Sequence, residues 1–299
     1  MIDFSRQLAE KPLHLIPERS VVTAEMLRSE IGDGPIVACD FHVVDIEHGT
    51  RVPGGFERDG IVNVDHHAPV AEMERHVSST NLALERVHAL GPADTVVIHH
   101  TDCDSVLSAG IMRGILPPDD RFGAAAISAD HTGTPDDIAD LLQGMQGRRD
   151  LHASFDALGK LLDRRPLPKM AQEALFDRRY QRAIAGRLTT PGELKLKDGL
   201  AWVRYDGGMD TALIPALVPD AALILVARRA RTGKWVMKLR LGLAAPAGAS
   251  LHRMGLHEFD PDFGGRWNAG SNRRSGGTKI SPNWYVRQLR DRMPRLLGS

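Results

Sequence analysis

Ile61-Val62-Asn63-Val64-Asp65-His66-His67 is the stretch of sequence that indicates the fold. Its first four residues are mostly β-branched and apolar, as in a strand buried inside a sheet, and three polar side chains come directly after them. In a parallel sheet, the residues that follow the strands gather at one edge, where ligands usually bind. The stretch therefore predicts a buried parallel strand whose carboxyl end carries functional side chains.

Three further runs in the first half of the chain have the composition of short strands. They cover residues 35–40, 95–98 and 124–127. Helix-like stretches lie between them: one begins near Ser79-Thr80, and another runs from residue 105 to about residue 116, where two prolines follow. The alternation predicts an α/β fold with a mostly parallel sheet and flanking helices in the N-terminal domain.

The composition changes in the second half of the chain. Residues 146–190 contain no β-branched run and alternate Arg and Lys with Leu and Ala, which predicts a helical linker. Strand-like runs follow at residues 199–205, 221–228 and 235–241, the last two joined by a hairpin-like connection. We therefore expect a metal-binding catalytic domain over residues 1–145, a linker over 146–190 and a smaller α/β domain with a mixed sheet over 191–299.

Charge and cysteine usage restrict the class of protein. The 38 basic and 38 acidic residues give a formal net charge of zero, so affinity for polyanions must come from local clusters. Cys39 and Cys103 lie in apolar strand-like runs, which favours buried thiols over a disulfide. No stretch approaches the roughly 20 apolar residues of a membrane helix, and the N-terminus lacks a signal peptide pattern. We expect a cytoplasmic protein with no membrane contact.

Carboxylates and imidazoles follow each of the predicted strands in the first half. They are Asp40, Asp65, His66, His67, His100, Asp102, Asp104 and Asp130. Because residues two apart in an extended segment point to the same side, His100, Asp102 and Asp104 can converge on one centre or on two neighbouring ones. An oxygen-rich set with a few imidazoles suits Mn²⁺ or Mg²⁺. Two such ions would activate a hydroxide and neutralise charge on a phosphoryl group, so hydrolysis of a phosphoester or phosphoanhydride bond is the predicted reaction.

Each of these motifs has a structural alternative. Adjacent histidines also occur at ordinary surfaces, and Asp102 and Asp104 could simply cap the helix that follows them. Asp40 and Asp130 could be plain strand ends. All four groups nevertheless follow predicted strands between residues 40 and 130, which favours one shared site.

A glycine-rich stretch in the second half suggests how substrate is held. Residues 263–277 contain five glycines and three arginines. Glycine lets backbone N–H groups approach an anion, and the arginine fork matches phosphate oxygens. We predict a phosphate-binding loop, and the alternative is a flexible basic surface loop. The predicted substrate-binding residues are Gly264, Gly265, Arg266, Asn268, Arg273 and Arg274.

Several motifs resemble those of the DHH phosphoesterase superfamily, which includes exonucleases, oligoribonucleases and manganese pyrophosphatases. Residues 62–67 with 77–82 resemble the DHH signature, and residues 100–104 resemble the His-x-Asp-x-Asp motif. Residues 39–42 and 129–133 are similar to two further Asp motifs. The glycine-rich stretch resembles that of the DHHA1 domain, which accompanies many DHH enzymes.

The resemblance implies a set of roles for these residues. It implies two Mn²⁺ or Mg²⁺ ions bridged by Asp40. His66, His100, Asp102, Asp104 and Asp130 would complete the ligands. It also implies that Asp65 orients an imidazole and that His67 faces the scissile phosphate.

The sequence departs from the family pattern at three points. The Asp-x-Asp motif follows the DHH motif here, whereas it usually precedes it. Ser105 stands where a Gly usually follows the second Asp, and its Cβ could restrict the approach of backbone to phosphate. After the paired glycines, Arg266 and Trp267 replace a Gly and a His.

These observations lead to an expected function with two alternatives. We expect a Mn²⁺- or Mg²⁺-dependent phosphoesterase that hydrolyses phosphodiester bonds in short single-stranded oligonucleotides or linear dinucleotides. The zero net charge argues against tracking along long nucleic acids. A phosphatase or pyrophosphatase acting on a small nucleotide or phosphorylated metabolite is one alternative, and a non-catalytic nucleotide-binding regulatory protein is the other. The expected partner is a phosphate-containing substrate, a nucleotide or short single strand, and the chain could form a homodimer.

Overall fold

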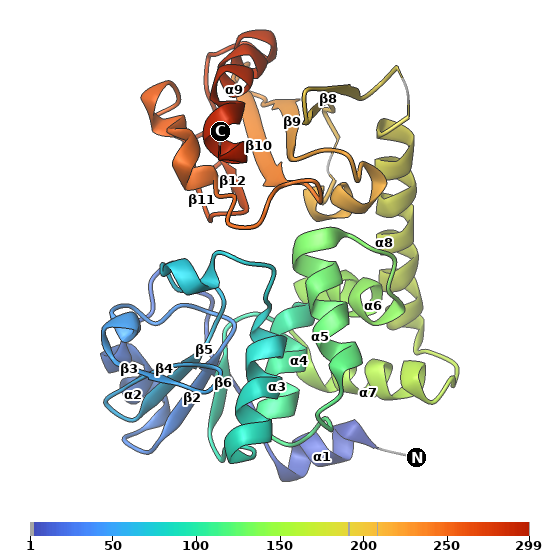
Figure 1. Ribbon diagram of the computed structural model, residues 1–299. Coiled ribbons are helices and arrows are strands. Elements are labelled where there is room, and N and C mark those ends of the chain that lie inside the picture. Colours follow the sequence, from blue (N-terminus) through green and yellow to red (C-terminus); the bar gives the residue numbers. More distant parts are fainter. Residues whose placement is uncertain (1–2, 191, 208, 299) are drawn as a thin grey trace. The chain divides into compact units, whose positions relative to one another are not determined.

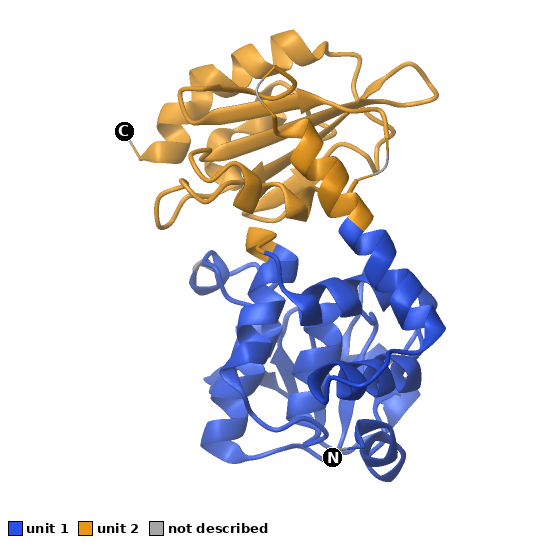
Figure 2. Cartoon of the chain, turned by 90° about the vertical axis from the view of Figure 1, so that its right-hand side faces the viewer, with its two compact units in different colours: residues 1–130, 135–179 blue, residues 131–134, 180–299 orange. Residues whose placement is uncertain are grey.

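The computed structural model describes residues 3–190, 192–207 and 209–298. The chain divides into two compact units (Figures 1 and 2). Unit 1 comprises Met1–Asp130 and Pro135–Arg179, and unit 2 comprises His131–Thr134 and Tyr180–Ser299. Each unit has its own sheet and is described separately.

A six-stranded sheet forms the centre of unit 1. Its strands are β1 (His14–Leu15), β2 (Ile36–Cys39), β3 (Thr50–Val52), β4 (Gly55–Arg58), β5 (Ile61–Val64) and β6 (Val96–Ile98), in the order β1-β6-β2-β5-β4-β3. The first four strands in this order run parallel, whereas β4 and β3 extend the sheet in antiparallel fashion beyond β5. The mostly parallel sheet predicted from the sequence is confirmed.

The helices of unit 1 lie against the sheet or beyond the helices that contact it. They are α1 (Phe4–Glu10), α2 (Ala24–Ile31), α3 (Ser79–Leu90), α4 (Cys103–Met112), α5 (Asp120–Ile127), α6 (Asp137–Met145), α7 (Leu151–Leu162) and α8 (Lys169–Leu188), with short helical turns between some of them. α3 and α4 contact the strands, and Figure 1 shows α5, α6 and α7 beyond them. Residues 146–190, expected as a helical linker, contain α7 and α8; the last residues of α8 belong to unit 2.

The order of the strands determines where a site can form. α3 leads from β5 to β6, and β2 lies between these two strands. The strand order therefore reverses at β2, and ligands of open α/β sheets bind outside the carboxyl ends of the strands at such a point. Ser78 caps α3 and Asp102 caps α4, each side chain accepting a backbone N–H bond. Both helix N-termini lie near this edge, since Ser79 of α3 and Ser105 of α4 contact Asp40 at the end of β2.

Two local expectations were wrong. Residues 124–127 form the last turn of α5, not a strand; Asp119 caps this helix, and the alanines favour helix. In a short apolar run, the spacing of the hydrophobic residues does not distinguish a buried strand from a helix. Asp130 therefore lies in a π-helical turn, Ser128–Thr132, rather than at a strand end. In addition, α4 already begins at Cys103, so residues 100–104 are not one extended segment. Both cysteines are nevertheless buried free thiols, as expected.

Unit 2 contains a mixed sheet, which confirms the predicted class. Its strands are β7 (Lys195–Lys197), β8 (Leu200–Arg204), β9 (Leu223–Arg229), β10 (Trp235–Leu241), β11 (Gly264–Gly265) and β12 (Ala269–Ser271), in the order β11-β12-β10-β9-β8-β7. Only β8 and β9 pair in parallel among these described strands. One face of the sheet packs on α9 (Pro282–Leu297), through residues such as Tyr285 and Leu289. The opposite face carries a smaller cluster that includes Val203 and Val226.

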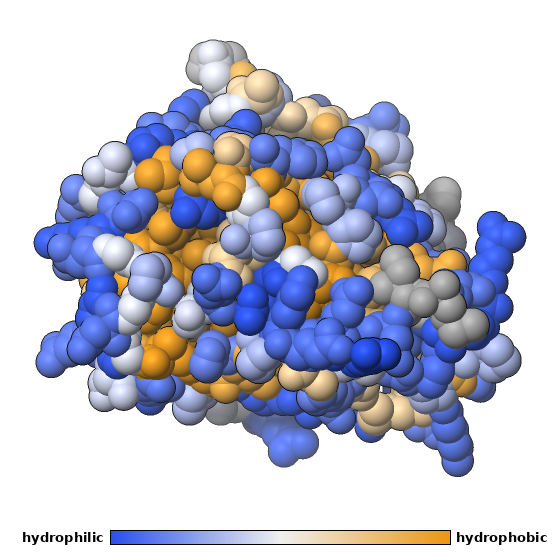
Figure 3. Space-filling model, turned by 90° about the horizontal axis from the view of Figure 1, so that it is seen from below, coloured by the Kyte–Doolittle hydropathy of each residue, from blue (hydrophilic) through white to orange (hydrophobic). Residues whose placement is uncertain are grey.

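The helices and one face of the surface can be compared with what a membrane span requires. Within residues 3–190, 192–207 and 209–298, no helix combines the length and the apolar character that a membrane span requires. Seen from below, the molecule presents mainly hydrophilic side chains, with apolar groups between them (Figure 3).

Candidate metal centre

Asp40 follows the central strand β2 and is 3% exposed. Its φ of 60° lies in the left-handed region, which Asp tolerates better than most residues but which still costs about 1 kcal/mol. Its Oδ1 accepts a hydrogen bond from Ser79 Oγ at 3.0 Å, and its Oδ2 accepts one from Ser105 Oγ at 2.7 Å. The carboxylate is thus fixed in a buried position at the carboxyl edge of the sheet.

Asn63 in β5 holds the turn that contains Asp40. Its Nδ2 donates to the carbonyl oxygens of Ala38, at 3.2 Å, and Phe41, at 2.8 Å. Its Oδ1 accepts from the backbone N–H of Val43 at 2.9 Å. This buried amide satisfies the backbone groups of the turn, which would otherwise lose hydrogen bonds inside the protein.

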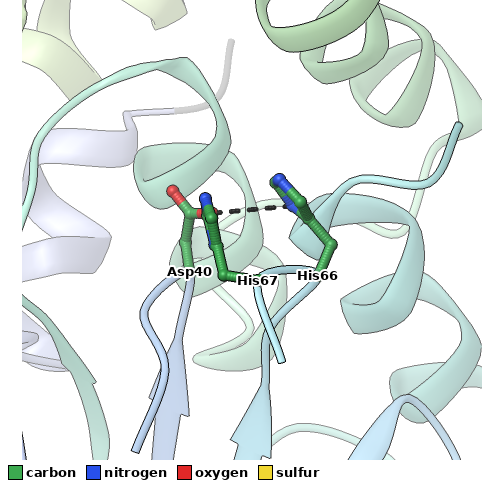
Figure 4. A group of neighbouring side chains, drawn as sticks. All are labelled: Asp40, His66 and His67. Atoms are coloured by element: carbon green, nitrogen blue, oxygen red, sulfur yellow. Dashed lines mark ion pairs between the residues drawn. The ribbon is translucent and has the colours of Figure 1, made fainter. Parts of the chain in front are cut away.

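His66 and His67 extend from the end of β5 toward Asp40 (Figure 4). The Nδ1 atom of His66 lies 3.9 Å from Asp40 Oδ1, and Nδ1 of His67 lies 3.8 Å from the same oxygen. The two rings stack with centroids 4.0 Å apart. Each of the three residues offers one ligand atom within 4.8 Å of the others, a spacing that a single cation could bridge.

A second group of potential ligands shares His66. Its Nδ1 lies 3.1 Å from Oδ2 of Asp104, and its Nε2 lies 3.5 Å from Oδ2 of Asp130. His66, Asp104 and Asp130 each offer one ligand atom, and these atoms lie within 4.8 Å of one another. Residues from the end of β5, the first turn of α4 and the π-helical turn therefore converge, although only the first of these is a strand end.

The N-terminus of α3 holds Asp104. Its Oδ2 accepts from the backbone N–H of Ser79 at 2.8 Å, and its Oδ1 accepts from the backbone N–H of Thr80 at 2.7 Å. Thr80 Oγ1 adds a third hydrogen bond to Oδ1 at 2.6 Å. A helix N-terminus stabilises negative charge, so this side chain is fixed as a carboxylate.

Asp65 contacts His67. Its Oδ1 lies 2.5 Å from His67 Nδ1, and the carboxylate is 1% exposed. Although burial opposes ionisation, the charge and hydrogen bond of His67 hold the pKa of Asp65 below its usual value. An ionised Asp65 can only accept, so the proton of this bond lies on Nδ1 of His67.

The electrostatics of the cluster fit a divalent cation. Burial, followed by the charges of Asp104, Asp102 and Asp130, raises the pKa of Asp40 well above its ordinary value. By contrast, the pKa of Asp104 is lowered despite its burial, because His66 and Thr80 bind its charged form. Buried carboxylates this close together repel one another, and a cation between them would remove the repulsion. The oxygen and imidazole donors suit Mn²⁺ or Mg²⁺.

His100 and Asp102 belong to neither group among the described residues. His100 Nδ1 instead lies 3.7 Å from Oε2 of Glu18. Asp102 Oδ1 accepts the backbone N–H of Ser105 at 3.0 Å, which is the capping role that the sequence left open. Because residues 100–104 are not one extended segment, their alternate side chains do not share a direction. Their role as metal ligands stays a prediction.

Sequence reasoning missed the hydroxyl groups that position the carboxylates. Ser79 and Thr80 were expected to begin a helix within the DHH-like signature, with no role for their hydroxyls, and Ser105 was expected only to replace a glycine. All three hydroxyls donate to Asp40 or Asp104. The sequence did contain an indication of these hydroxyls: small polar residues occur at two helix starts, each next to a carboxylate motif.

The predicted phosphate-binding residues lie in unit 2. β11 and β12 form a tight hairpin in which the backbone N–H of Arg266 donates to Ala269 O at 2.7 Å. Gly265 has φ 157°, and a Cβ there would lie 2.2 Å from Gly270 Cα, so the hairpin requires glycine. Asn268 is buried, with Nδ2 3.0 Å from Nδ1 of His131. Gly264, Arg273 and Arg274 are exposed.

The comparisons with known proteins give a likeness to solved structures. No family model matches the chain, and no curated protein is similar to it in sequence. Among solved structures, the chain is similar to PggH, a pGpG-specific phosphodiesterase from Vibrio cholerae, with 12% identity and a TM-score of 0.45. The match covers 69% of this chain and 81% of that one. A likeness of this degree does not define a reaction, so the function has to be inferred from the chain's own side chains.

Proposed function

We propose that the chain is a phosphodiesterase that uses divalent cations, Mn²⁺ or Mg²⁺, held in unit 1. The observation that carries this proposal is the meeting of Asp40, His66, His67, Asp104 and Asp130 at the carboxyl edge of a parallel sheet. Few buried clusters combine this many carboxylates with imidazoles for structural reasons alone, because their mutual repulsion destabilises the fold.

Asp40, His66, Asp104 and Asp130 are the residues that would hold the cations. Asp40 and His66 would contribute atoms toward one ion, and His66, Asp104 and Asp130 toward the other, while His67 of the first group would face the substrate instead. Bound cations would supply Lewis-acid stabilisation of phosphoryl charge and lower the pKa of water. The hydroxyls of Ser79, Thr80 and Ser105 would keep the carboxylates in position.

His67 would act on the substrate directly. Asp65 accepts a hydrogen bond from Nδ1–H of His67. Nε2 is therefore the ring nitrogen that can exchange a proton. In the protonated state, stabilised by the carboxylate of Asp65, His67 would donate a hydrogen bond to a non-bridging phosphate oxygen. This contact would strengthen as negative charge develops during cleavage, which is what catalysis requires.

Short nucleotides are the substrate class that we propose. The formal net charge of zero gives no field that would hold a long polyanion. Exposed Arg273 and Arg274, with the glycine hairpin, would bind the phosphates of a linear dinucleotide or short single strand.

Hydrolysis of bis-nitrophenyl phosphate tests this function. The assay compares the parent protein with Asp130→Asn, which alters a side chain that is 16% exposed and less constrained than Asp104. We expect activity with Mn²⁺, none with chelator, and a loss of about 100-fold or more in the variant. Asp120→Asn, an exposed residue in the first turn of α5, is the matched control and should retain activity.

The substrate class needs a separate measurement. Product analysis with mononucleotides, linear dinucleotides and longer single strands should show fastest cleavage of the dinucleotides. Equal release of nitrophenol by the parent and Asp130→Asn would contradict the proposed centre, and nucleotide binding without any hydrolysis would contradict catalysis.

A further inference from the structure

We propose that unit 2 contains a second site, a cationic pocket that binds the phosphate group of a nucleotide without a metal ion. The pocket has a volume of about 210 Å³. Arg228, Lys238 and Arg273 line it, together with the side chains of Tyr205 and Thr211. Of these five residues, Arg273 alone belongs to the glycine-rich stretch.

The sheet places the cations on one face. Lys238 in β10 pairs with Val226 in β9, and Arg228 lies two residues beyond Val226. Side chains two residues apart in a strand point to the same side, so Arg228 and Lys238 flank the buried Val226. On the other side, Lys238 pairs with Ser271 of β12, and Arg273 follows two residues later. Val226 thus contributes an apolar wall between cationic groups.

The positive charge in the pocket is only partly balanced by the protein, through the charge of Asp210 near Lys238. In the part of the chain that the structure describes, none of the three cations forms an ion pair with a carboxylate. Arg228 Nε is buried and has no hydrogen-bond partner among these residues. A buried N–H group without an acceptor is costly, and an anion in the pocket would supply the acceptor.

The state of Lys238 supports the same conclusion. Burial lowers its pKa, and the neighbouring charges of Arg273, Arg228 and Arg240 lower it further, while Asp210 opposes them. A lysine whose pKa is lowered by neighbouring cations is held close to them against electrostatic repulsion. Binding of an anion would remove this repulsion, so the protein is arranged for a ligand of negative charge.

A phosphate monoester is the ligand that fits best. Two guanidinium groups can each form paired hydrogen bonds with phosphate oxygens, and Lys238 adds a compact charge. Ligand pockets for complete small molecules usually exceed about 300 Å³, so this smaller one suits a phosphate with part of its sugar. The dianionic charge of a phosphate monoester matches three cations better than the single charge of a carboxylate.

Calorimetric titration of the full chain tests the pocket. The titrations are made in the presence of chelator, so that binding at the metal centre does not contribute. Inorganic phosphate and adenosine 5′-monophosphate are the probes, and adenosine and acetate are the comparison ligands. We expect both probes to bind, and both comparison ligands to bind at least about tenfold more weakly, because charge-assisted bonds to phosphate supply most of the affinity.

Matched variants locate the binding. Arg228→Gln and Lys238→Gln should each weaken phosphate binding about tenfold or more. Arg229→Gln is the control, since Arg229 is the next residue of β9, points to the opposite face and contacts Trp235. Tryptophan fluorescence verifies that each variant is folded, because all four tryptophans lie in unit 2.

Three results would overturn this inference. They are the absence of phosphate binding by the parent, equal binding by the parent and both pocket variants, and acetate binding as tight as phosphate binding. The pocket shares Arg273 with the substrate-binding residues proposed above, but phosphate binding in it does not require the proposed catalytic function. Because chelator is present throughout, a failure here and a failure of the hydrolysis assay are distinguishable.

Discussion

Ser105 Oγ donates a 2.7 Å hydrogen bond to Oδ2 of Asp40. The sequence placed this serine where the related pattern has glycine, and its Cβ was expected to crowd a phosphate. In the structure, its hydroxyl instead stabilises the charged form of a buried carboxylate, since the hydrogen bond lowers a pKa that burial and neighbouring charges raise. The departure from the pattern is therefore compatible with a working site.

Ser105→Ala should weaken the metal centre without removing it. Without the hydroxyl, the pKa of Asp40 rises further, so the carboxylate needed for cation binding forms only at higher pH. We expect Mn²⁺ affinity near neutral pH to fall about tenfold and the acid limb of the activity profile to move to higher pH. Ser108→Ala, in the same helix, is the control, because Ser108 Oγ donates to the backbone oxygen of Asp104. An unchanged acid limb in Ser105→Ala would contradict this role.

Asp65→Asn tests the role of His67. The amide keeps the size of the side chain but no longer stabilises a protonated imidazole through charge. We expect kcat to fall about 10- to 100-fold, while Mn²⁺ affinity changes little. The measurement is a pair of titrations, one of activity and one of Mn²⁺ binding. A parallel loss of Mn²⁺ affinity would instead identify His67 as a metal ligand, which its place beside Asp40 would allow.

His99 should make the stability of unit 1 sensitive to acid. This residue is 7% exposed and packs on Phe41 with ring centroids 4.5 Å apart. Burial, with the charge of His100, lowers its pKa from 6.5 to about 4. The unfolded chain therefore binds the proton more readily between these pH values, and stability falls as the pH drops through this range, by at most about 2 kcal/mol at pH 5.

Urea unfolding at pH 7 and pH 5 in chelator checks this expectation. Circular dichroism follows the whole chain, and tryptophan fluorescence follows unit 2 alone, which allows the transition of unit 1 to be separated. His99→Phe should reduce the acid-induced loss, whereas His48→Phe, at an exposed position, should not. If both variants show the same loss as the parent, His99 is not the responsible group.

Tyr285→Phe should destabilise unit 2. The Tyr285 hydroxyl donates to Asp260 Oδ2 at 3.0 Å, and Asn272 Nδ2 donates to the same oxygen at 2.9 Å. Loss of one bond to a buried carboxylate costs about 1.5–3 kcal/mol. Fluorescence-detected urea unfolding measures this loss, with Tyr180→Phe, 61% exposed, as the control. A Tyr285→Phe transition superimposed on that of the parent would refute the expectation.

The strands were predictable where a β-branched apolar run was followed directly by polar residues. The runs at residues 35–40, 61–64 and 95–98 became β2, β5 and β6, because β-branched residues flanked by loops have little alternative inside an α/β fold. The three strands of the second half and the hairpin between β9 and β10 were likewise confirmed. What failed was the run of alanines before Asp130, because alanine fits a helix as well as a buried strand and a cap at Asp119 decided the outcome.

The members of the cluster were less predictable than its location. Asp40, His66, Asp104 and Asp130 do lie together, yet two of them arrive on helical turns rather than strand ends. The side-chain direction of residues 100–104 depended on where α4 begins, and an earlier start turned His100 toward Glu18. Hydroxyl donors such as Ser79 are recognisable only when their acceptor is known, which requires the tertiary structure.

Direct titration with Mn²⁺, followed by electron paramagnetic resonance, tests the central claim most simply. The parent, His66→Ala and the control His48→Ala are compared, since His66 belongs to both groups and His48 is exposed. We predict that the parent and His48→Ala bind Mn²⁺ equally and that His66→Ala binds it at least about tenfold more weakly. Equal binding of Mn²⁺ by all three proteins, or no binding by the parent, would contradict the metal centre.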